Sequence, residues 1–352
     1  MRKTNMLALF LALFLQFQIS YAQELNPLFQ SDSILKITIK LSLDEVLNDL
    51  VVRDYHEAKL SYKRPDGSVF KHKAKVKIRG NNRAKVTTCR FPPLKVNFKK
   101  SKLENSVFEG QNKIKLVTHC NSNKNANQLI LKEYLTYKLY QQITPYSLGV
   151  RLCEITYIDT SNDNEESIHY GFFIEDIDHL AARSNMIVYE DSIANQDVCV
   201  RAELDKMTVF QYMIGNLDWS VPNRHNMKLI AESSESLPVA VPYDFDFAGF
   251  VGAPYAKPPA EFGLQSVKQR FFMGFCRSEG EYELTLSSFK EKKNAILSVV
   301  EQSTLLTDKN KKQAFNYLQG FFVILDKPKQ AESRIIKGCR VDHKHLYQYE
   351  KH

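Results

Sequence analysis

The chain has 352 residues, of which 43% are hydrophobic and 11% aromatic, enough for one large domain or two smaller units that share a cleft. The formal net charge is +8, but Lys and Arg are spread along the whole chain and form no basic stripe. Composition therefore gives no support to nucleic-acid binding, and we expect the excess charge to be ordinary solvated surface.

Residues 1–22 have the three parts of a secretory signal peptide. Arg2 and Lys3 precede an apolar run from Met6 to about Phe17, and a small residue, Ala22, marks the expected cleavage point. The run is shorter than a membrane-spanning helix requires, and no later segment approaches that length. We therefore expect a secreted, periplasmic or cell-surface protein with no transmembrane segment after cleavage.

Six cysteines lie in the predicted mature chain: Cys89, Cys120, Cys153, Cys199, Cys276 and Cys339. An even number in an exported protein permits disulfide bonds, and the wide spacings exclude a zinc knuckle. The sequence alone does not give the pairing.

Four stretches near the N-terminus alternate apolar and polar residues with the period of a β-strand. They are Ile34–Leu41, Glu57–Lys63, His72–Gly80 and Pro93–Phe98, with a turn signal at residues 65–67. These segments predict an antiparallel sheet with one polar face.

Helical spacing then appears over residues 127–142, and Asn125 or Asn127 is suited to cap the start of this helix. A strand hairpin is expected from residues 149–159 and 169–178. The second half predicts helices over residues 202–217, 282–302 and 310–327, with two short strands at residues 226–230 and 238–245.

The expected organisation is α+β, with strands concentrated in the first half and helices in the second. We predict a signal peptide at 1–22, a β-rich unit at 23–178, a helical unit at 179–345 and a polar tail at 346–352. The His residues of the segment "HKHLYQYEKH", residues 343–352, are expected to be solvated and not to bind metal.

Three polar residues in the second half occupy positions that suit metal-assisted chemistry. Asp218 follows a helix in the segment "NLDWSVPNRHN", Asn226 directly precedes a strand, and Asp244 ends the next apolar strand. A carboxylate in the first position can act as a base, and amide and carboxylate oxygens are ligands for Mg²⁺. The alternative is a plain loop and hairpin, because Asp, Asn and Pro are common in turns.

A second segment suits phosphate binding. "RGNNR", residues 79–83, lies between two predicted strands and can offer backbone N–H groups, Asn81 and the cations of Arg79 and Arg83. Lys95 on the next strand would point into a cleft, where Glu133 of the following helix could pair with it. The alternatives are a turn for Gly80-Asn81, a solvated face for Lys95 and a surface position for Glu133.

The order of these features resembles the CotH-type (spore coat protein H) kinase-like family of atypical protein kinases. The resemblance lies in "RGNNR", "FPPLKVNF", "ILKEYLTYKLY", "YGFFIEDID", "DWSVPNRHN" and "PYDFD", and it covers about residues 70–255. No single motif is specific, but their order is. It implies a two-lobed protein-kinase-like fold, with a β-rich N-terminal lobe and a mostly helical C-terminal lobe.

By position, the resemblance makes Asp218 the catalytic residue and Asn226 and Asp244 the metal ligands, with Asp246 as an alternative or second ligand. Asn223 remains a further candidate, since it stands at the five-residue spacing of ordinary kinases. The implied cofactor-binding set is Arg79, Asn81, Arg83, Lys95, Glu133 and Glu175, where Glu175 begins a connector that lines the adenine pocket. "RGNNR" departs from the family by having Asn82 where Ser is frequent.

The resemblance implies an exported enzyme that uses ATP and Mg²⁺ or Mn²⁺ to phosphorylate a hydroxyl of a protein substrate. The alternative is a non-catalytic, pseudokinase-like surface or coat scaffold, which has no need to retain Asp218, Asn226 and Asp244 together. A metal-assisted hydrolase ranks last, because the sequence has no His-x-x-x-His pair and no nucleophile elbow.

Overall fold

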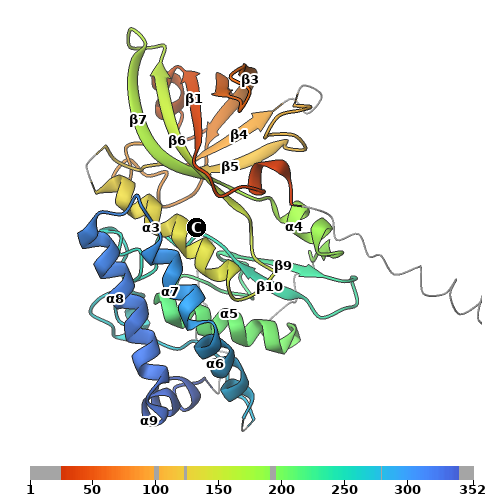
Figure 1. The fold of residues 1–352 in the computed structure, drawn as a ribbon, viewed down its shortest axis with the longest axis vertical. Helices are drawn as coiled ribbons and strands as arrows, with labels where there is room; N and C mark the ends of the chain where they lie inside the picture. The colour runs from red at the N-terminus through yellow and green to blue at the C-terminus, as the bar shows by residue number, and fades with distance from the viewer. Residues whose placement is uncertain (1–24, 99–102, 123–124, 191–195, 279, 341–352) are drawn as a thin grey trace, which may run out of the picture.

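The computed structural model describes residues 25–98, 103–122, 125–190, 196–278 and 280–340. The predicted signal peptide and the polar tail therefore lie outside the described residues. Most strands gather at one end of the molecule and most helices at the other (Figure 1).

Seven strands form one closed sheet. They are β1 (Leu35–Leu41), β2 (His56–Lys63), β3 (Val69–Ile78), β4 (Leu94–Phe98), β5 (Lys113–Val117), β6 (Val150–Asp159) and β7 (Glu165–Ile174). Their order is β1-β2-β3-β4-β5-β7-β6, and β1 also pairs in parallel with β6, with Leu35 opposite Cys153. This last pair closes the sheet into a barrel.

The barrel shows that the predicted kinase-like fold is wrong. That fold requires an open β-sheet in the N-terminal lobe, whereas this sheet has no free edge because β6 returns to β1. The strand positions were predicted well, but alternation reports only that one face of each strand is buried. An open sheet packed on another layer and a barrel filled by its own side chains satisfy the same pattern.

The remaining elements follow the barrel strands or lie between them. The helices are α2 (Leu43–Asn48), α3 (Ala126–Gln141), α4 (Ile177–Arg183), α5 (Arg201–Ile214), α6 (Glu281–Glu291), α7 (Lys293–Glu301), α8 (Asp308–Leu325) and α9 (Pro328–Ala331). Short helical turns lie at Pro27–Phe29, Gln196–Val198, Ala260–Phe262 and Glu332–Ile336. A small antiparallel sheet has the order β10 (Val239–Pro242), β9 (Met227–Ala231), β8 (Ile187–Val188).

Two hydrophobic cores hold these elements together. One fills the barrel with residues such as Leu60, Val76 and Phe108. The other joins α3 to the helices α5 to α8 and to β9 and β10, around residues such as Phe210 and Phe321. Helix α3 touches β6 and β7 on one side and α7 on another, so it connects the barrel with the helical part.

Two disulfide bonds are present, Cys89–Cys120 and Cys276–Cys339, while Cys153 and Cys199 are buried outside both bonds. Disulfides are typical of proteins from oxidising compartments, which fits the predicted export. Within the described ranges, no helix is both long and apolar enough to cross a membrane.

Candidate functional site

The loop that carries Asp218 begins where α5 ends. Gly215 has a φ of +64°, and a Cβ at this position would collide with the hydroxyl of Tyr317, so only glycine fits. The next residue, Asn216, is buried, and its Oδ1 accepts a hydrogen bond from the backbone N–H of Asp218 at 3.1 Å. Ser220 and His225 pair across the loop through both backbone N–H groups. These contacts fix the backbone on both sides of Asp218.

The Asp218 carboxylate is held by two neighbours from the same loop. His225 Nε2 lies 2.7 Å from Oδ1, and Asn226 Nδ2 donates to Oδ2 at 2.9 Å and to the Asp218 carbonyl at 2.8 Å. The hydrogen bond with Asp218 raises the pKa of His225. Because the Asp218 side chain remains 24% exposed, a substrate group can still approach it.

Asn226 and Asp244 lie at the same end of the β9–β10 hairpin. The N–H of Tyr243 donates to the carbonyl of Asn226 at 3.1 Å, and Tyr137 Oη of α3 accepts from the N–H of Asp244 at 2.9 Å. Both residues have left-handed backbones, with φ values of +50° and +62°. Such conformations are uncommon for residues other than glycine, but Asn and Asp adopt them more readily than other side chains do.

The donor atoms at this end of the hairpin fit a hard cation held in part by a phosphate. Since Asn226 Nδ2 is bonded to Asp218, the amide Oδ1 is left as the atom that can face a metal. Asp244 adds a carboxylate, and the described residues contain no group of three or more His, Cys, Asp or Glu arranged as a metal site. A cation held by these two oxygens would need phosphate and water as its remaining ligands, an arrangement that is common for Mg²⁺.

One cation near Asp244, Lys115, was not predicted from the sequence. Burial, together with the charges of Arg79 and Lys228, lowers the pKa of Lys115 to about 8, while Asp176 and Asp244 oppose this shift. The Lys115 ammonium lies 4.6 Å from the centre of the Tyr243 ring. Lys115 stands on β5, a short strand that was not predicted. Lys95, which was predicted, is directly opposite Lys115 on β4.

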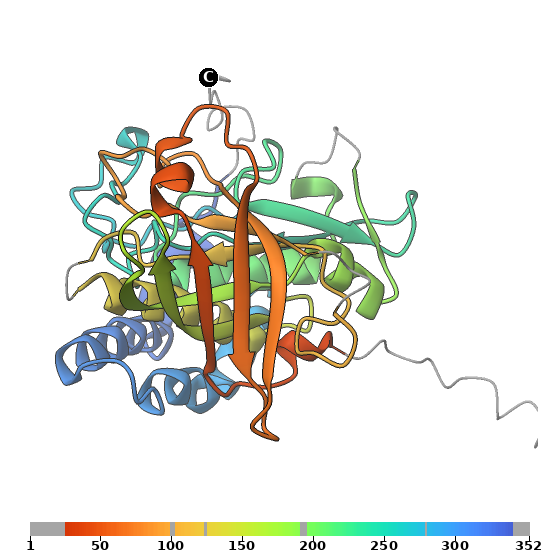
Figure 2. The same cartoon turned by 90° about the horizontal axis from the view of Figure 1, so that it is seen from above.

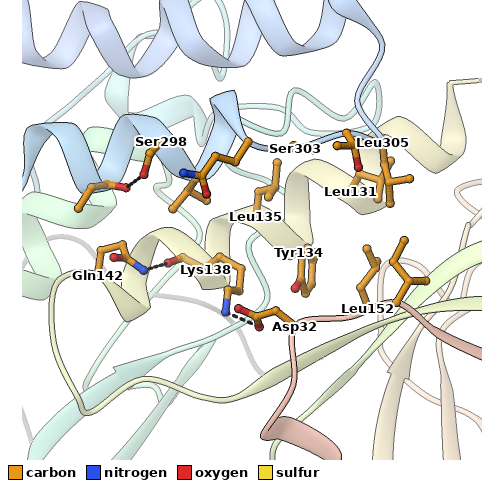
Figure 3. Close-up of a pocket in the computed structure, with 15 residues that line it drawn as sticks. Asp32, Leu131, Tyr134, Leu135, Lys138, Gln142, Leu152, Ser298, Ser303 and Leu305 are labelled. Carbon is orange, nitrogen blue, oxygen red and sulfur yellow. Dashed lines mark hydrogen bonds and ion pairs between the residues drawn. The ribbon is translucent and has the colours of Figure 1, made fainter. Parts of the chain in front are cut away.

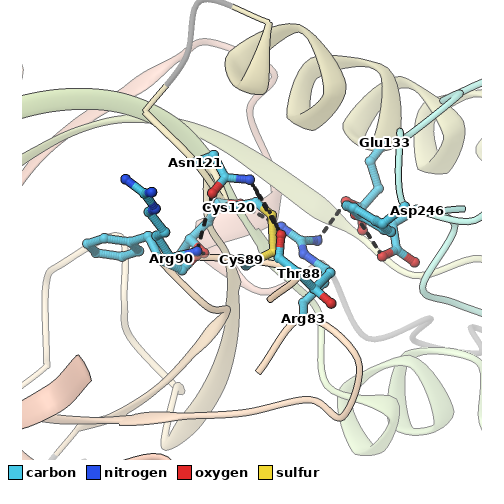
Figure 4. The surroundings of a disulfide bond; sticks show 11 residues. Arg83, Thr88, Cys89, Arg90, Cys120, Asn121, Glu133 and Asp246 are labelled. Carbon is cyan, nitrogen blue, oxygen red and sulfur yellow. Dashed lines mark hydrogen bonds and ion pairs between the residues drawn. A yellow bond between two sulfur atoms is a disulfide. The ribbon is translucent and has the colours of Figure 1, made fainter. Parts of the chain in front are cut away.

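Arg83 and Glu133 form a buried ion pair next to this site. Arg83 donates to Glu133 Oε2 at 3.1 Å and to the Thr118 carbonyl at 2.6 Å, and neither side chain is more than 6% exposed. Glu133 thus pairs with Arg83, whereas the sequence had left Lys95 or the surface as its alternatives. Burial raises the pKa of Glu133 to about 7. Figure 4 shows Arg83, Glu133 and Asp246 converging beside the Cys89–Cys120 disulfide.

Asp246 does not lie on the same strand face as Asp244, because β10 ends at Pro242 and the backbone turns at Asp244. Its side chain is buried, and Tyr255 Oη donates to it at 3.0 Å. Burial and the negative charge of Asp244 raise the pKa of Asp246 well above its usual value. With Arg83 and Glu133 it lines a cavity of about 380 Å³.

We expect the Asp246→Asn variant to gain stability relative to the parent as the pH rises. A carboxyl with a raised pKa keeps its proton in the folded state after the unfolded chain has lost it, so the parent loses stability above about pH 4. The free energy of unfolding of the parent can fall by about 1.4 kcal/mol per pH unit. The variant lacks this contribution, because the amide of Asn does not titrate. Urea unfolding of both proteins at pH 5 and pH 8 measures the difference between their free energies of unfolding. The same difference at both pH values would contradict a protonated Asp246.

Three predicted residues do not join this group. Asn81 and Asn223 are exposed. The buried Glu175 carboxylate accepts from Arg183 at 3.0 Å and from the backbone N–H of Gly149 at 2.7 Å. Its side chain therefore fastens α4 to the barrel end.

A second cavity of about 380 Å³ lies between α3, α7 and the segment before β1 (Figure 3). Lys138 and Asp32 form an ion pair of 2.8 Å at its edge, and Leu131, Leu135 and Tyr134 line it. It contains none of the predicted site residues.

Compared with known proteins, the chain matches no protein-family model, and no curated protein matches its sequence. The resemblance to CotH-type proteins therefore stays a prediction, and the function has to be argued from the site.

Proposed function

We propose that this chain is an exported phosphotransferase that moves the γ-phosphoryl group of ATP to a Ser or Thr hydroxyl of a protein, with Mg²⁺ or Mn²⁺. The observation that carries the proposal is the grouping of Asp218, Asn226 and Asp244 at one end of the β9–β10 hairpin, with the Lys115 ammonium 4.6 Å from the ring centre of Tyr243, the residue before Asp244. Acids with a cation close by suit a triphosphate with its metal. The motif order shared with CotH-type proteins agrees with the same assignment.

Each side chain then has a distinct role. Asp218, oriented by His225 and Asn226, would accept the proton of the substrate hydroxyl or direct that hydroxyl toward phosphorus. Asn226 and Asp244 would hold the divalent ion, which neutralises charge on the phosphates when it is bound. Lys115 and Arg79 would hold phosphate oxygens, and the row of lysines across β3, β4 and β5 extends this basic surface to Lys95.

A non-catalytic scaffold is the second candidate. It is favoured by the fact that both Asp218 oxygens already accept hydrogen bonds within the loop, as a purely structural carboxylate would. The two candidates differ in one respect that can be measured, since only an enzyme transfers the terminal phosphate.

The test is to incubate the mature chain with γ-labelled ATP, Mn²⁺ and a mixture of Ser- and Thr-containing peptides, beside the Asp244→Ala variant. We expect label in the peptides with the parent, and none after chelation of the metal or with the variant. Absence of transfer by the parent, or equal transfer by both proteins, would overturn the proposal.

A further inference from the structure

The outward face of the first three barrel strands is rich in lysine. Successive side chains of a strand point to opposite faces, so the residues that alternate with the buried core face solvent. On β1, β2 and β3 the only carboxylate at these outward positions is Glu57. We call the outward lysines the lysine face: Lys36, Lys40, Lys59, Lys63, Lys71, Lys73, Lys75 and Lys77.

These three strands lie side by side on the part of the barrel turned away from the helical end of the molecule (Figure 2). The lysines that are scattered in the sequence therefore gather on one surface of the fold. Such a concentration of one charge creates a local positive potential that attracts anions.

The strand register places like charges directly opposite one another. Lys40 on β1 pairs with Lys59 on β2, which pairs with Lys73 on β3. Opposed like charges destabilise a sheet, so this row is unfavourable for the barrel alone. Lys75 bonds to Glu57 at 3.1 Å, but none of Lys40, Lys59 and Lys73 has an ion pair with a residue that the structure describes.

The same three lysines line a hollow in the surface. A cavity of about 360 Å³ is lined by Lys40, Lys59 and Lys73 and also by two carboxylates, Glu45 and Glu57. The charges of the lining side chains give it an excess of positive charge, which favours an anionic side chain. The hollow therefore offers a specific position within a broader charged surface.

The lysine face is continuous with the candidate site. Lys77 on β3 stands opposite Lys95 on β4, and Lys95 stands opposite Lys115 on β5. The Lys115 ammonium in turn lies 4.6 Å from the centre of the Tyr243 ring, next to Asp244 in the chain. A row of cations thus leads around the barrel from the lysine face to the residues proposed to act in phosphoryl transfer.

We infer that the lysine face docks an acidic segment of the protein substrate and delivers a neighbouring hydroxyl to the site. The outward positions of β1–β3 have no aromatic residue on which the bases of a single-stranded nucleic acid could stack. The proposed function takes a protein as its substrate, so an acidic segment of that protein is the occupant that fits the positive charge of this surface. In an extended acidic peptide, carboxylates on every second residue lie about 6.6 Å apart. The alternate lysines along β3 have the same spacing. The inference rests on the proposed function for the identity of the substrate.

The test is binding of a fluorescent Glu- and Asp-rich peptide that contains one Ser, measured by anisotropy at low salt. Replacing Lys40, Lys59 and Lys73 together with Gln should weaken binding about tenfold, because three charge contacts are lost. The control variant replaces Lys290, Lys309 and Lys312, which are exposed in the helical part, and should bind within twofold of the parent.

Removing the opposed row should not lower the melting temperature, so weaker binding cannot be attributed to unfolding. Asp218→Asn should bind the peptide as tightly as the parent does. Docking is therefore tested by binding alone, even if no phosphoryl transfer is found. Equal binding by the lysine variant and the parent would overturn the inference. Tighter binding of polyphosphate or of anionic lipid vesicles than of the peptide would also overturn it, because the occupant would then be of another class.

Discussion

Asp218→Asn should lower phosphoryl transfer by about 10²–10⁴-fold, the range over which a positioned acid or base contributes. The substitution keeps the shape of the side chain but removes the charge that orients the acceptor hydroxyl. Nucleotide binding should change little, because the proposed metal ligands Asn226 and Asp244 are both retained. The measurement is the initial rate of label transfer at saturating ATP and Mn²⁺.

A matched control is Asp163→Asn, which makes the same change in the exposed β6–β7 turn, far along the sequence from the site residues. It should transfer label at the rate of the parent. If Asp218→Asn also keeps the parental rate, while both variants have the parent's melting temperature, then Asp218 has no part in the chemistry.

Arg83→Met should cost about 3–5 kcal/mol of the free energy of unfolding, the usual loss when one partner of a buried ion pair is removed. It leaves Glu133 buried without its cation and the Thr118 carbonyl without its donor. Because the pKa of Glu133 is already raised to about 7, protonation relieves part of this loss at lower pH. Urea unfolding at pH 8 gives the full effect.

The comparison variant is Lys138→Met, which breaks the more exposed pair with Asp32 and should cost about 1 kcal/mol or less. The double variant Arg83→Met/Glu133→Leu should recover much of the loss, since it leaves no buried charge. An Arg83→Met protein within 1 kcal/mol of the parent would contradict a structural role for this pair.

Most strands and helices could be predicted because each has a buried face with regular spacing. Strand β4 was expected at Pro93–Phe98 and is observed at Leu94–Phe98, and α3 was expected over 127–142 and is observed at Ala126–Gln141. The closure of the barrel could not be predicted, because the β1–β6 pair joins residues more than a hundred positions apart and leaves no local signal. The fold prediction failed at that point.

Within the site, the order of Asp218, Asn226 and Asp244 was visible in the sequence, but the pairing of the surrounding charges was not. Glu133 meets Arg83 and Lys115 comes close to Asp244 only because α3 and β5 pack where they do. The short strand β5, "KIKLV", alternates as a strand should, but it was not predicted. Its lysine was missed together with the strand.

The central claim is that Asp244 and the cations of the barrel bind a nucleotide together with a divalent ion. Isothermal titration of the parent with ATP, with and without Mn²⁺, tests it most directly. We expect binding that requires Mn²⁺ and that Asp244→Asn reduces to the level seen without metal. No binding of ATP at millimolar concentration in the presence of Mn²⁺, or the same affinity in the variant, would contradict the account.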